Sequence, residues 1–182
     1  MTDDYVSPPA EENKKPKLGL LTRLRSIGIQ LILLMVMIWG VDLWMTRNTV
    51  HATPPPINLQ TITGEQFSTE SLKGQASLIH FWGTWCPICN IEQGTMDSMG
   101  ASYPMVTVAM QSGSDDEISA YLLDKGVSYR VINDDSGEIS EQYGVKTVPT
   151  TFVLDREGNI KFVTQGYSSE LGLRFKLWLA SL

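Results

Sequence analysis

The sequence predicts an α/β domain built on a central mixed sheet flanked by helices, with one N-terminal transmembrane helix before it. Two observations carry this prediction. Residues 27–45 are almost wholly apolar, and from residue 57 onward short apolar runs alternate with helix-like segments, the pattern of an α/β sheet. The length of 182 residues suits one compact domain with an appendage, because two full domains would need a longer chain.

Residues 27–45 are long enough to cross a membrane. At about 1.5 Å per helical residue they span roughly 28 Å, close to the hydrocarbon thickness of a bilayer. Only Gln30 and Asp42 interrupt the apolar run, whereas a core helix of this length usually carries a polar stripe. Trp39 and Trp44 lie toward its far end, where aromatic rings favour the headgroup region. We therefore expect a lipid bilayer around this segment.

Charge predicts how the segment is oriented. Arg47 alone follows the segment closely, whereas five basic residues precede it: Lys14, Lys15, Lys17, Arg23 and Arg25. This asymmetry places the N-terminus in the cytoplasm. In a bacterium the folded domain then lies in the periplasm, held by a single-pass anchor in the inner membrane. The formal net charge of −6 argues against a nucleic-acid partner, because such proteins present clustered Lys and Arg.

A cleavable signal peptide is the alternative to an anchor. Residues Val50–Ala52 have the sizes that a signal peptidase accepts. The length of the apolar run and its acidic, proline-bearing leader favour an uncleaved anchor. Residues 1–26 are expected to form a disordered cytoplasmic tail with a basic flank, 46–56 a stiff proline-rich spacer, and 57–182 the folded domain.

The elements of the folded domain follow from its apolar runs. Strands are predicted at 76–82, 105–110, 129–134, 151–155 and 160–165, the last two as an antiparallel pair. Helices are predicted from the cysteines to about residue 102, at 115–125, at 137–143 and at the C-terminus. In the last helix one apolar stripe recurs at helical spacing: Leu171, Phe175, Trp178 and Leu182. We expect this stripe to face the core.

Cys86 and Cys89 are the only cysteines, separated by two residues. A purely structural disulfide across so short a loop constrains the unfolded chain little. Zinc needs four ligands, and the histidines available are His51, in the spacer, and His80, in a strand. We therefore expect no bound metal, and interpret the pair as a redox centre.

The position of the cysteines supports redox chemistry. Cys86 falls where a strand ends and a helix begins, so its sulfur would face unpaired backbone N–H groups, which favour the thiolate. Pro87 suits the first helical turn. Cys86 is thus the expected nucleophile, and Cys89, one turn along and further inside the helix, the expected resolving thiol.

The strand, the motif WCPIC and the distant segment VPTTFVLDREGNI together resemble thioredoxin-fold proteins, in the membrane-tethered TlpA-like branch. The layout is most similar to the suppressor of copper sensitivity protein D group. The resemblance covers residues 57–182. It implies a thioredoxin fold, protein thiol or disulfide substrates, a membrane electron donor of the DsbD type, and no cofactor beyond the redox-active disulfide. It also implies a role linked to copper tolerance or cytochrome c maturation.

The resemblance also assigns residues. It implies that the Val148–Pro149 peptide bond is cis and lies against the disulfide, with Val148 offering its backbone to substrate. Trp85 and Pro87 are the further expected substrate-binding residues.

Two more positions concern proton transfer. His80 stands where thioredoxins carry a buried acid, and Glu92 matches a glutamate of relatives that act in cytochrome c maturation. Each is a candidate for proton handling, since an imidazole or a shifted carboxyl can serve near neutral pH. A core histidine and a solvated helix residue are the alternatives.

The residues between the thiols bear on electron direction. Pro87 and Ile88 supply no cation that would stabilise the Cys86 thiolate, which favours a reductase over a strong oxidant.

Two other functions stay open. One is a Cu(I)-binding module, in which Met96 and Met99 would join the thiolates, although methionines at this spacing more often lie in the core. The other is a peroxiredoxin-like peroxidase, for which Thr84 stands near Cys86 but the expected proline is absent.

Overall fold

The computed structural model describes residues 25, 27–37, 40 and 53–182, which fall into two units divided after Val41. In the first unit residues 27–37 are helical. Within the described part of the chain no helix is both long and apolar enough to cross a membrane. The remainder of the predicted anchor, nearly all of the predicted tail and residues 46–52 of the spacer lie outside the described residues.

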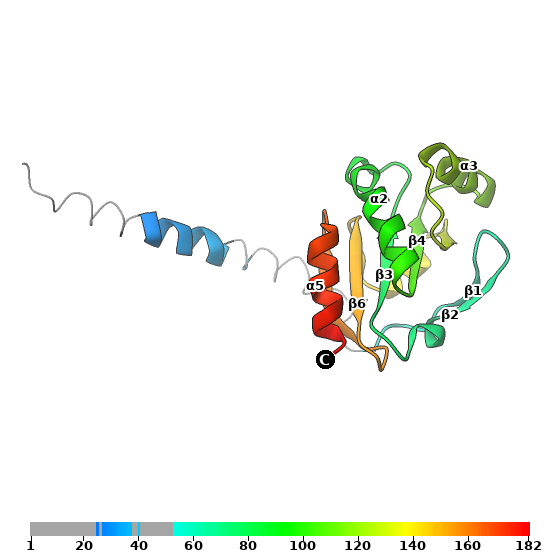
Figure 1. Cartoon of the computed structure of the whole chain (residues 1–182). Helices are drawn as coiled ribbons and strands as arrows, with labels where there is room; N and C mark the ends of the chain where they lie inside the picture. Colours follow the sequence, from blue (N-terminus) through cyan, green and yellow to red (C-terminus); the bar gives the residue numbers. More distant parts are fainter. Residues whose placement is uncertain (1–24, 26, 38–39, 41–52) are drawn as a thin grey trace, which may run out of the picture. The chain divides into compact units, whose positions relative to one another are not determined.

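The second unit is built on a five-stranded sheet with the strand order β5-β4-β3-β6-β7 (Figure 1). Its strands are β3 (Ser77–Trp82), β4 (Met105–Met110), β5 (Val131–Asp134), β6 (Thr150–Leu154) and β7 (Ile160–Gln165). Strands β3, β4 and β5 are parallel, whereas β6 is antiparallel to β3 and β7 to β6. The predicted central mixed sheet is confirmed, with boundaries within about two residues of the predicted ones.

Four helices accompany the sheet among the described residues of this unit: α2 (Pro87–Ser102), α3 (Asp115–Lys125), α4 (Glu138–Gln142) and α5 (Glu170–Ala180). Ser114 caps α3 in a reciprocal capping box with Glu117, and Gly126 ends it in the left-handed conformation that glycine adopts readily. A small antiparallel pair, β1 (Asn58–Gln60) and β2 (Gln66–Ser68), and a short 3-10 helix, η1 (Thr69–Leu72), were not predicted. Strands of three residues are too short to show a period in the sequence.

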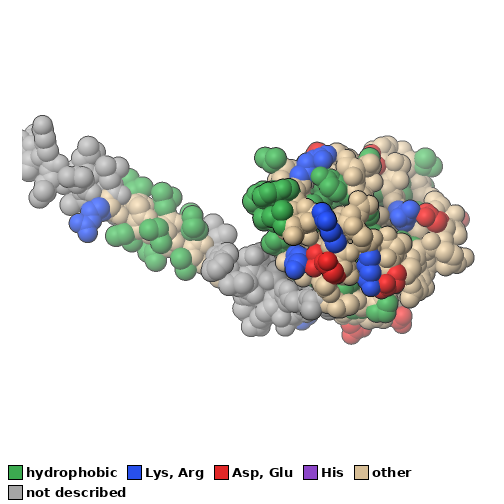
Figure 2. Space-filling model, turned by 60° about the horizontal axis from the view of Figure 1, so that its bottom comes forward, with side chains coloured by type: hydrophobic (Ala, Val, Ile, Leu, Met, Phe, Trp, Pro, Cys, Tyr) green, Lys and Arg blue, Asp and Glu red, His purple; other side chains and the backbone are tan. Residues whose placement is uncertain are grey.

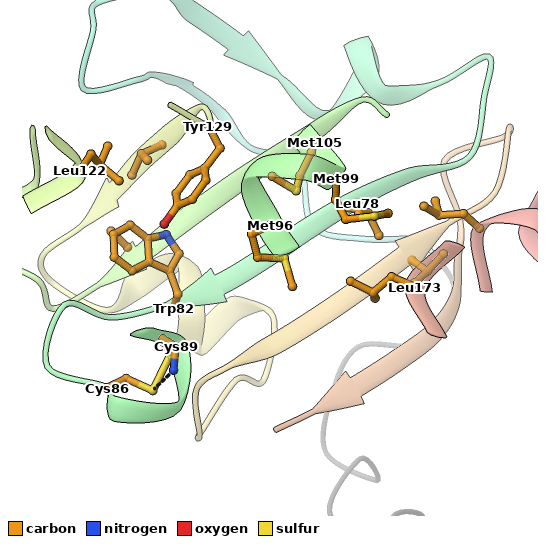
Figure 3. Packing of buried hydrophobic residues seen from close by; sticks show 14 of the residues in the cluster. Leu78, Trp82, Cys86, Cys89, Met96, Met99, Met105, Leu122, Tyr129 and Leu173 are labelled. Atoms are coloured by element: carbon orange, nitrogen blue, oxygen red, sulfur yellow. Dashed lines mark hydrogen bonds between the residues drawn. A yellow bond between two sulfur atoms is a disulfide. The ribbon is translucent and has the colours of Figure 1, made fainter. Parts of the chain in front are cut away.

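The side chains of β3 divide the core into two layers, because alternate residues of a strand point to opposite faces. Leu78 and Trp82 join a cluster with buried side chains of α2, α3 and α5 (Figure 3), whereas Ile79 and Phe81 join a cluster with η1 and α4. His80 alternates with Ile79 and Phe81, so it points toward the layer that contains α2.

The prediction for the terminal helix was wrong in one respect. The stripe of Leu171, Phe175, Trp178 and Leu182 is exposed, and the buried side chains of α5 are Leu173, Leu177 and Ala180. Both sets recur at the same helical spacing, so periodicity shows that a helix forms without showing which stripe packs on the sheet.

Candidate active site

The two cysteines lie at the junction between β3 and α2. Cys86 is the N-cap residue of α2, with extended backbone, and its Sγ accepts a hydrogen bond from the backbone N–H of Cys89 at 3.2 Å. Pro87 occupies the first turn, where its missing N–H leaves no helical hydrogen bond unmade. The amino end of α2 therefore directs partial positive charge at the Cys86 sulfur, which favours a thiolate there.

Cys86 and Cys89 form a disulfide, with their Cα atoms 5.3 Å apart. Both are buried, Cys86 at 4% exposure and Cys89 at 1%. Figure 3 shows the pair at the end of the apolar cluster, beside Trp82. Cys86 is thus the sulfur nearer to solvent and Cys89 the one further inside.

The loop before β6 closes one side of the site. The Val148–Pro149 peptide bond is cis, and Sγ of Cys86 lies 3.6 Å from the carbonyl oxygen of Val148. The loop is fixed at both ends, because the Pro149 carbonyl accepts a hydrogen bond from Gly166 at 2.8 Å and Thr150 Oγ1 donates to the Thr147 carbonyl at 2.7 Å. Val148 is half-buried and Pro149 is buried.

Four exposed apolar side chains belong to the start of α2 or to segments that adjoin it. Trp85 is 57% exposed, Ile88 45%, Ile91 73% and Tyr167 57%. Trp85, Ile88 and Ile91 flank or belong to the first turns of α2, and Tyr167 precedes Ser168, which contacts this helix. We call these four residues the site rim. Sequence reasoning identified Trp85 but missed Ile91 and Tyr167, because their exposure is visible only in the structure.

Trp85 is held in place by two features. Its Nε1 donates a hydrogen bond to the Met110 carbonyl at 3.1 Å. A Cβ atom at Gly83 would lie 2.8 Å from the indole ring, closer than real Cβ contacts allow. Glycine at position 83 is therefore what lets the indole lie against the backbone.

A polar pair is buried in the layer between β3 and α2. His80 is 2% exposed and Glu92 is fully buried. Oε1 of Glu92 lies 3.5 Å from Nε2 of His80, and Nδ1 of His80 is 2.9 Å from Oγ1 of Thr151. Oε2 of Glu92 accepts a hydrogen bond from the backbone N–H of Ser168 at 2.9 Å, whereas Oε1 has no hydrogen-bond partner among the described residues.

Burial shifts the ionisation of both groups. Burial raises the pKa of Glu92 to about 7, although the hydrogen bond from the Ser168 N–H acts in the opposite direction. Burial also lowers the pKa of His80 to about 3. His80 is therefore neutral at neutral pH, and Glu92 exchanges its proton there. Since Glu92 is three residues after Cys89, both side chains lie on one face of α2. The alternative of a solvated Glu92 is wrong.

The metal-binding alternatives concern the cysteines, the methionines of α2 and the two histidines. No group of three or more His, Cys, Asp or Glu side chains there is placed to hold a metal ion. Met96 and Met99 are buried in the core cluster, and His51 lies outside the described residues.

Comparison with known proteins identifies relatives of this chain. Residues 50–163 match the AhpC/TSA family. A thioredoxin-like protein of Haemophilus influenzae is 31% identical over 162 residues, which cover 88% of this chain and 96% of the relative. Sporulation thiol-disulfide oxidoreductase A of Bacillus subtilis is 28% identical over 149 residues, 78% of this chain and 89% of the relative.

A solved structure extends the likeness to three dimensions. The crystal structure of a thiol:disulfide interchange protein from Chlorobium tepidum matches with a TM-score of 0.63 at 27% identity, over 72% of this chain and 97% of that one. Together with the Cys86–Cys89 disulfide, these relatives show that the chain is a thiol-disulfide oxidoreductase of thioredoxin fold. Because the family match spans more than half of its residues and a relative shares 31% identity along most of its length, the chain belongs to the AhpC/TSA family.

Proposed function

We propose that this chain is a membrane-anchored, periplasmic reductase of protein disulfides that works through Cys86 and Cys89. One observation carries the disulfide-exchange part of the proposal: Sγ of Cys86 lies at the amino end of α2 and 3.6 Å from the Val148 carbonyl, and Cys89 is buried. The partial positive charge at the amino end of the helix stabilises a thiolate at this position. The sulfur also lies beside backbone that an extended substrate can approach.

The reaction has two exchange steps. In the reduced protein the Cys86 thiolate attacks a substrate disulfide, forming a mixed disulfide and releasing one substrate thiolate, which takes up a proton. Cys89 then loses its proton and attacks Sγ of Cys86, which closes the Cys86–Cys89 disulfide and releases the second substrate thiolate. Two electrons pass from the protein dithiol to the substrate, and a donor must then reduce the protein.

Glu92 is the proposed acceptor of the Cys89 proton. Its carboxyl lies on the same face of α2 and has a pKa raised to about 7, in the range where a general base works near neutral pH. His80 faces Oε1 of Glu92 as a neutral imidazole. We assign it a positioning role, because its own lowered pKa keeps it from carrying charge at neutral pH.

The site rim is the proposed contact surface for protein substrates. Exposed aromatic and aliphatic side chains around a reactive group bind apolar segments of a partner and exclude water from the reacting atoms. Trp85 and Pro87 would contact the substrate from the α2 side, and the backbone of Val148 with Pro149 from the other. The relative from Bacillus subtilis, named a thiol-disulfide oxidoreductase, supports this class of chemistry.

Location and direction rest on the sequence. The apolar segment 27–45 behind a basic flank supports an anchor with the domain in the periplasm. A membrane donor of the DsbD type could then reach the protein within the plane of the membrane. Pro87 and Ile88 supply no cation to the Cys86 thiolate, which favours a reducing protein. The resemblance to the suppressor of copper sensitivity protein D group supports a link to copper tolerance. The glutamate at position 92 supports a link to cytochrome c maturation.

The direction of electron flow is tested by the reduction potential. The full chain is equilibrated with mixtures of reduced and oxidised glutathione, and the fraction of free thiol is measured by alkylation. A reductase is expected to have a potential well below about −200 mV. A value near about −120 mV, that of a strong oxidant, would reject the reductase proposal.

A further inference from the structure

The exposed stripe of α5 is an apolar surface without a role in the proposed reaction. We call it the α5 face; it comprises Leu171, Phe175, Trp178 and Leu182, which are 79%, 57%, 55% and 86% exposed. The Phe175 and Trp178 rings stack on each other with their centroids 5.8 Å apart. In Figure 2 hydrophobic side chains gather on the side of the domain where α5 lies. A contiguous patch of this kind marks an interaction site more often than chance exposure does.

The charges on α5 are of both signs, because Glu170 is the first residue of the helix. Residues 171–182 contain Arg174 and Lys176 and no acidic residue. By helical geometry Arg174 borders the face, whereas Lys176 lies nearer the side of α5 that packs on the sheet. Arg174 is paired with Glu170 at 2.8 Å, and Nζ of Lys176 lies 2.5 Å from Oγ1 of Thr164. Exposed Leu, Phe and Trp side chains on one face of a helix can bury themselves in the headgroup region of a bilayer.

The α5 face lies toward the sheet edge opposite the disulfide. Cys86 follows the end of β3, whereas Tyr103 leads into β4, which runs parallel to β3. Tyr103 therefore lies at the edge where both strands begin. The Arg174 guanidinium is 5.6 Å from the centroid of the Tyr103 ring, so this side chain reaches toward that edge. Figure 1 shows α5 running beside β6 and ending, at the C-terminus, at the lower side of the domain, where β3 begins.

The chain enters the folded domain at the same edge. Oγ1 of Thr53 donates a hydrogen bond to Oδ1 of Asn159 at 3.1 Å. Asn159 belongs to the turn between β6 and β7, and because β6 is antiparallel to β3, that turn lies where β3 begins. Residues 46–52 separate Thr53 from the proposed anchor. Seven residues reach at most about 25 Å, so an anchored domain would hold this edge close to the bilayer.

We infer that the α5 face rests in the headgroup region of the membrane, with the phospholipid surface as its partner. The inference rests on the anchor of the proposed function. Docking through four side chains is weak alone, but the tether raises the effective concentration of lipid at the α5 face. The disulfide, at the opposite edge, then points away from the bilayer toward soluble protein substrates. A second copy fits less well, because four partly exposed side chains offer less than the roughly 800 Å² that a standard interface takes from each partner.

Spin labels on the full chain test the inference. Both native cysteines are replaced, Cys86→Ser and Cys89→Ser, and one cysteine is introduced at a time: Leu171→Cys on the α5 face, Leu123→Cys on α3 as the matched control, or Val36→Cys in the proposed anchor. Leu171 and Leu123 are 79% and 82% exposed, so neither change disturbs the core. The labelled protein is reconstituted into nanodiscs of phosphatidylcholine and phosphatidylglycerol. Collision rates are measured with oxygen, which concentrates in lipid, and with a water-soluble nickel complex.

The inference predicts that labels at 171 and 36 collide with oxygen and are shielded from nickel, whereas the label at 123 collides freely with nickel. A label at 171 as open to nickel as the one at 123, with the label at 36 in lipid, overturns the inference and leaves the anchor standing. Shielding at 171 accompanied by spin–spin broadening assigns the face to a second copy and also overturns it. A label at 36 in water rejects the anchor, and the α5 inference fails with it because it rests on the anchor.

Discussion

Oε1 of Glu92 lies 3.5 Å from Nε2 of His80 in a part of the core from which solvent is excluded. The pair joins the strand that precedes the cysteines to the helix that carries them. Burial raises the pKa of Glu92 to about 7 and lowers the pKa of His80 to about 3. At neutral pH Glu92 is therefore partly protonated and His80 is neutral. Four predictions follow from this pair and from the rim.

Glu92→Gln is expected to slow thiol-disulfide exchange at pH 7 by about 100-fold, the lower range for loss of a general base. The inflection near pH 7 in the rate should disappear with it. Stopped-flow mixing of the reduced protein with a protein disulfide, from pH 5 to 9, measures both effects. Glu141→Gln, at an exposed position on α4, is the matched control and should leave the profile as it is. An unchanged inflection in Glu92→Gln would show that another group takes the Cys89 proton.

The same substitution should change how stability depends on pH. A carboxyl whose folded-state pKa is raised from 4.5 to about 7 contributes stability below pH 4.5 that is lost as the pH rises through 7, about 3 kcal/mol in all. Glu92→Gln removes this loss. The difference in unfolding free energy between variant and native protein should therefore shift toward the variant by about 3 kcal/mol between pH 4.5 and 8.

Urea unfolding of the oxidised protein at both pH values measures that shift. The contribution of His80 to the unfolding free energy changes with pH in the opposite direction. Because the pKa of His80 is lowered, the folded state becomes less stable as the pH falls from 6.5 toward 3. Its contribution is present in both proteins and cancels in the difference. A difference that stays constant with pH would mean that Glu92 keeps an ordinary pKa.

His80→Ala is expected to leave the fold intact, at a stability cost of about 2 kcal/mol for the cavity and the lost contact with Thr151. If His80 positions Glu92, the inflection in the plot of exchange rate against pH should lie at a different pH in the variant than in the native protein. Thr151→Val, which removes only the partner of Nδ1, is the control for the hydrogen bond. A pH profile identical to that of the native protein would limit His80 to a packing role.

Gly83→Ala should displace Trp85, because the new Cβ would lie 2.8 Å from the indole. Trp85 is exposed, so the ring can move outward at the cost of its hydrogen bond to Met110. We expect KM for a protein disulfide to rise several-fold while the rate with a small disulfide stays the same. Gly94→Ala, on α2 with no atom within 4 Å of the new Cβ, is the control. Equal loss with both substrates would argue against a rim that binds protein.

The sequence predicted the sheet well, because its strands are buried apolar runs with clear boundaries. The cysteine junction was also predictable, since a C-x-x-C pair between a strand and a helix has a local signature. The polar contacts of Glu92 were not. Its partners His80 and Ser168 are brought to it by β3 and by the loop before α5, and no local pattern records a contact across 76 residues.

The α5 face shows a different limit. Leu173, Leu177 and Ala180 repeat with the same spacing as Leu171, Phe175 and Trp178. The larger side chains suggested that the second set is buried, but burial depends on which stripe meets the sheet, and the stripe that meets it is the first. The second stripe is the α5 face, for which we propose the membrane as partner.

Capture of mixed disulfides tests the central claim, that Cys86 attacks substrate and Cys89 resolves the intermediate, most directly. The full chain is expressed as Cys89→Ser and as Cys86→Ser, thiols are blocked with acid and alkylating agent, and adducts that dissociate on reduction are quantified. We predict that Cys89→Ser accumulates mixed disulfides with other proteins, because Cys86 reacts and nothing resolves the product. Cys86→Ser should accumulate almost none, since Cys89 is 1% exposed. Equal adduct levels in the two variants, or adducts through Cys89 alone, would contradict the account.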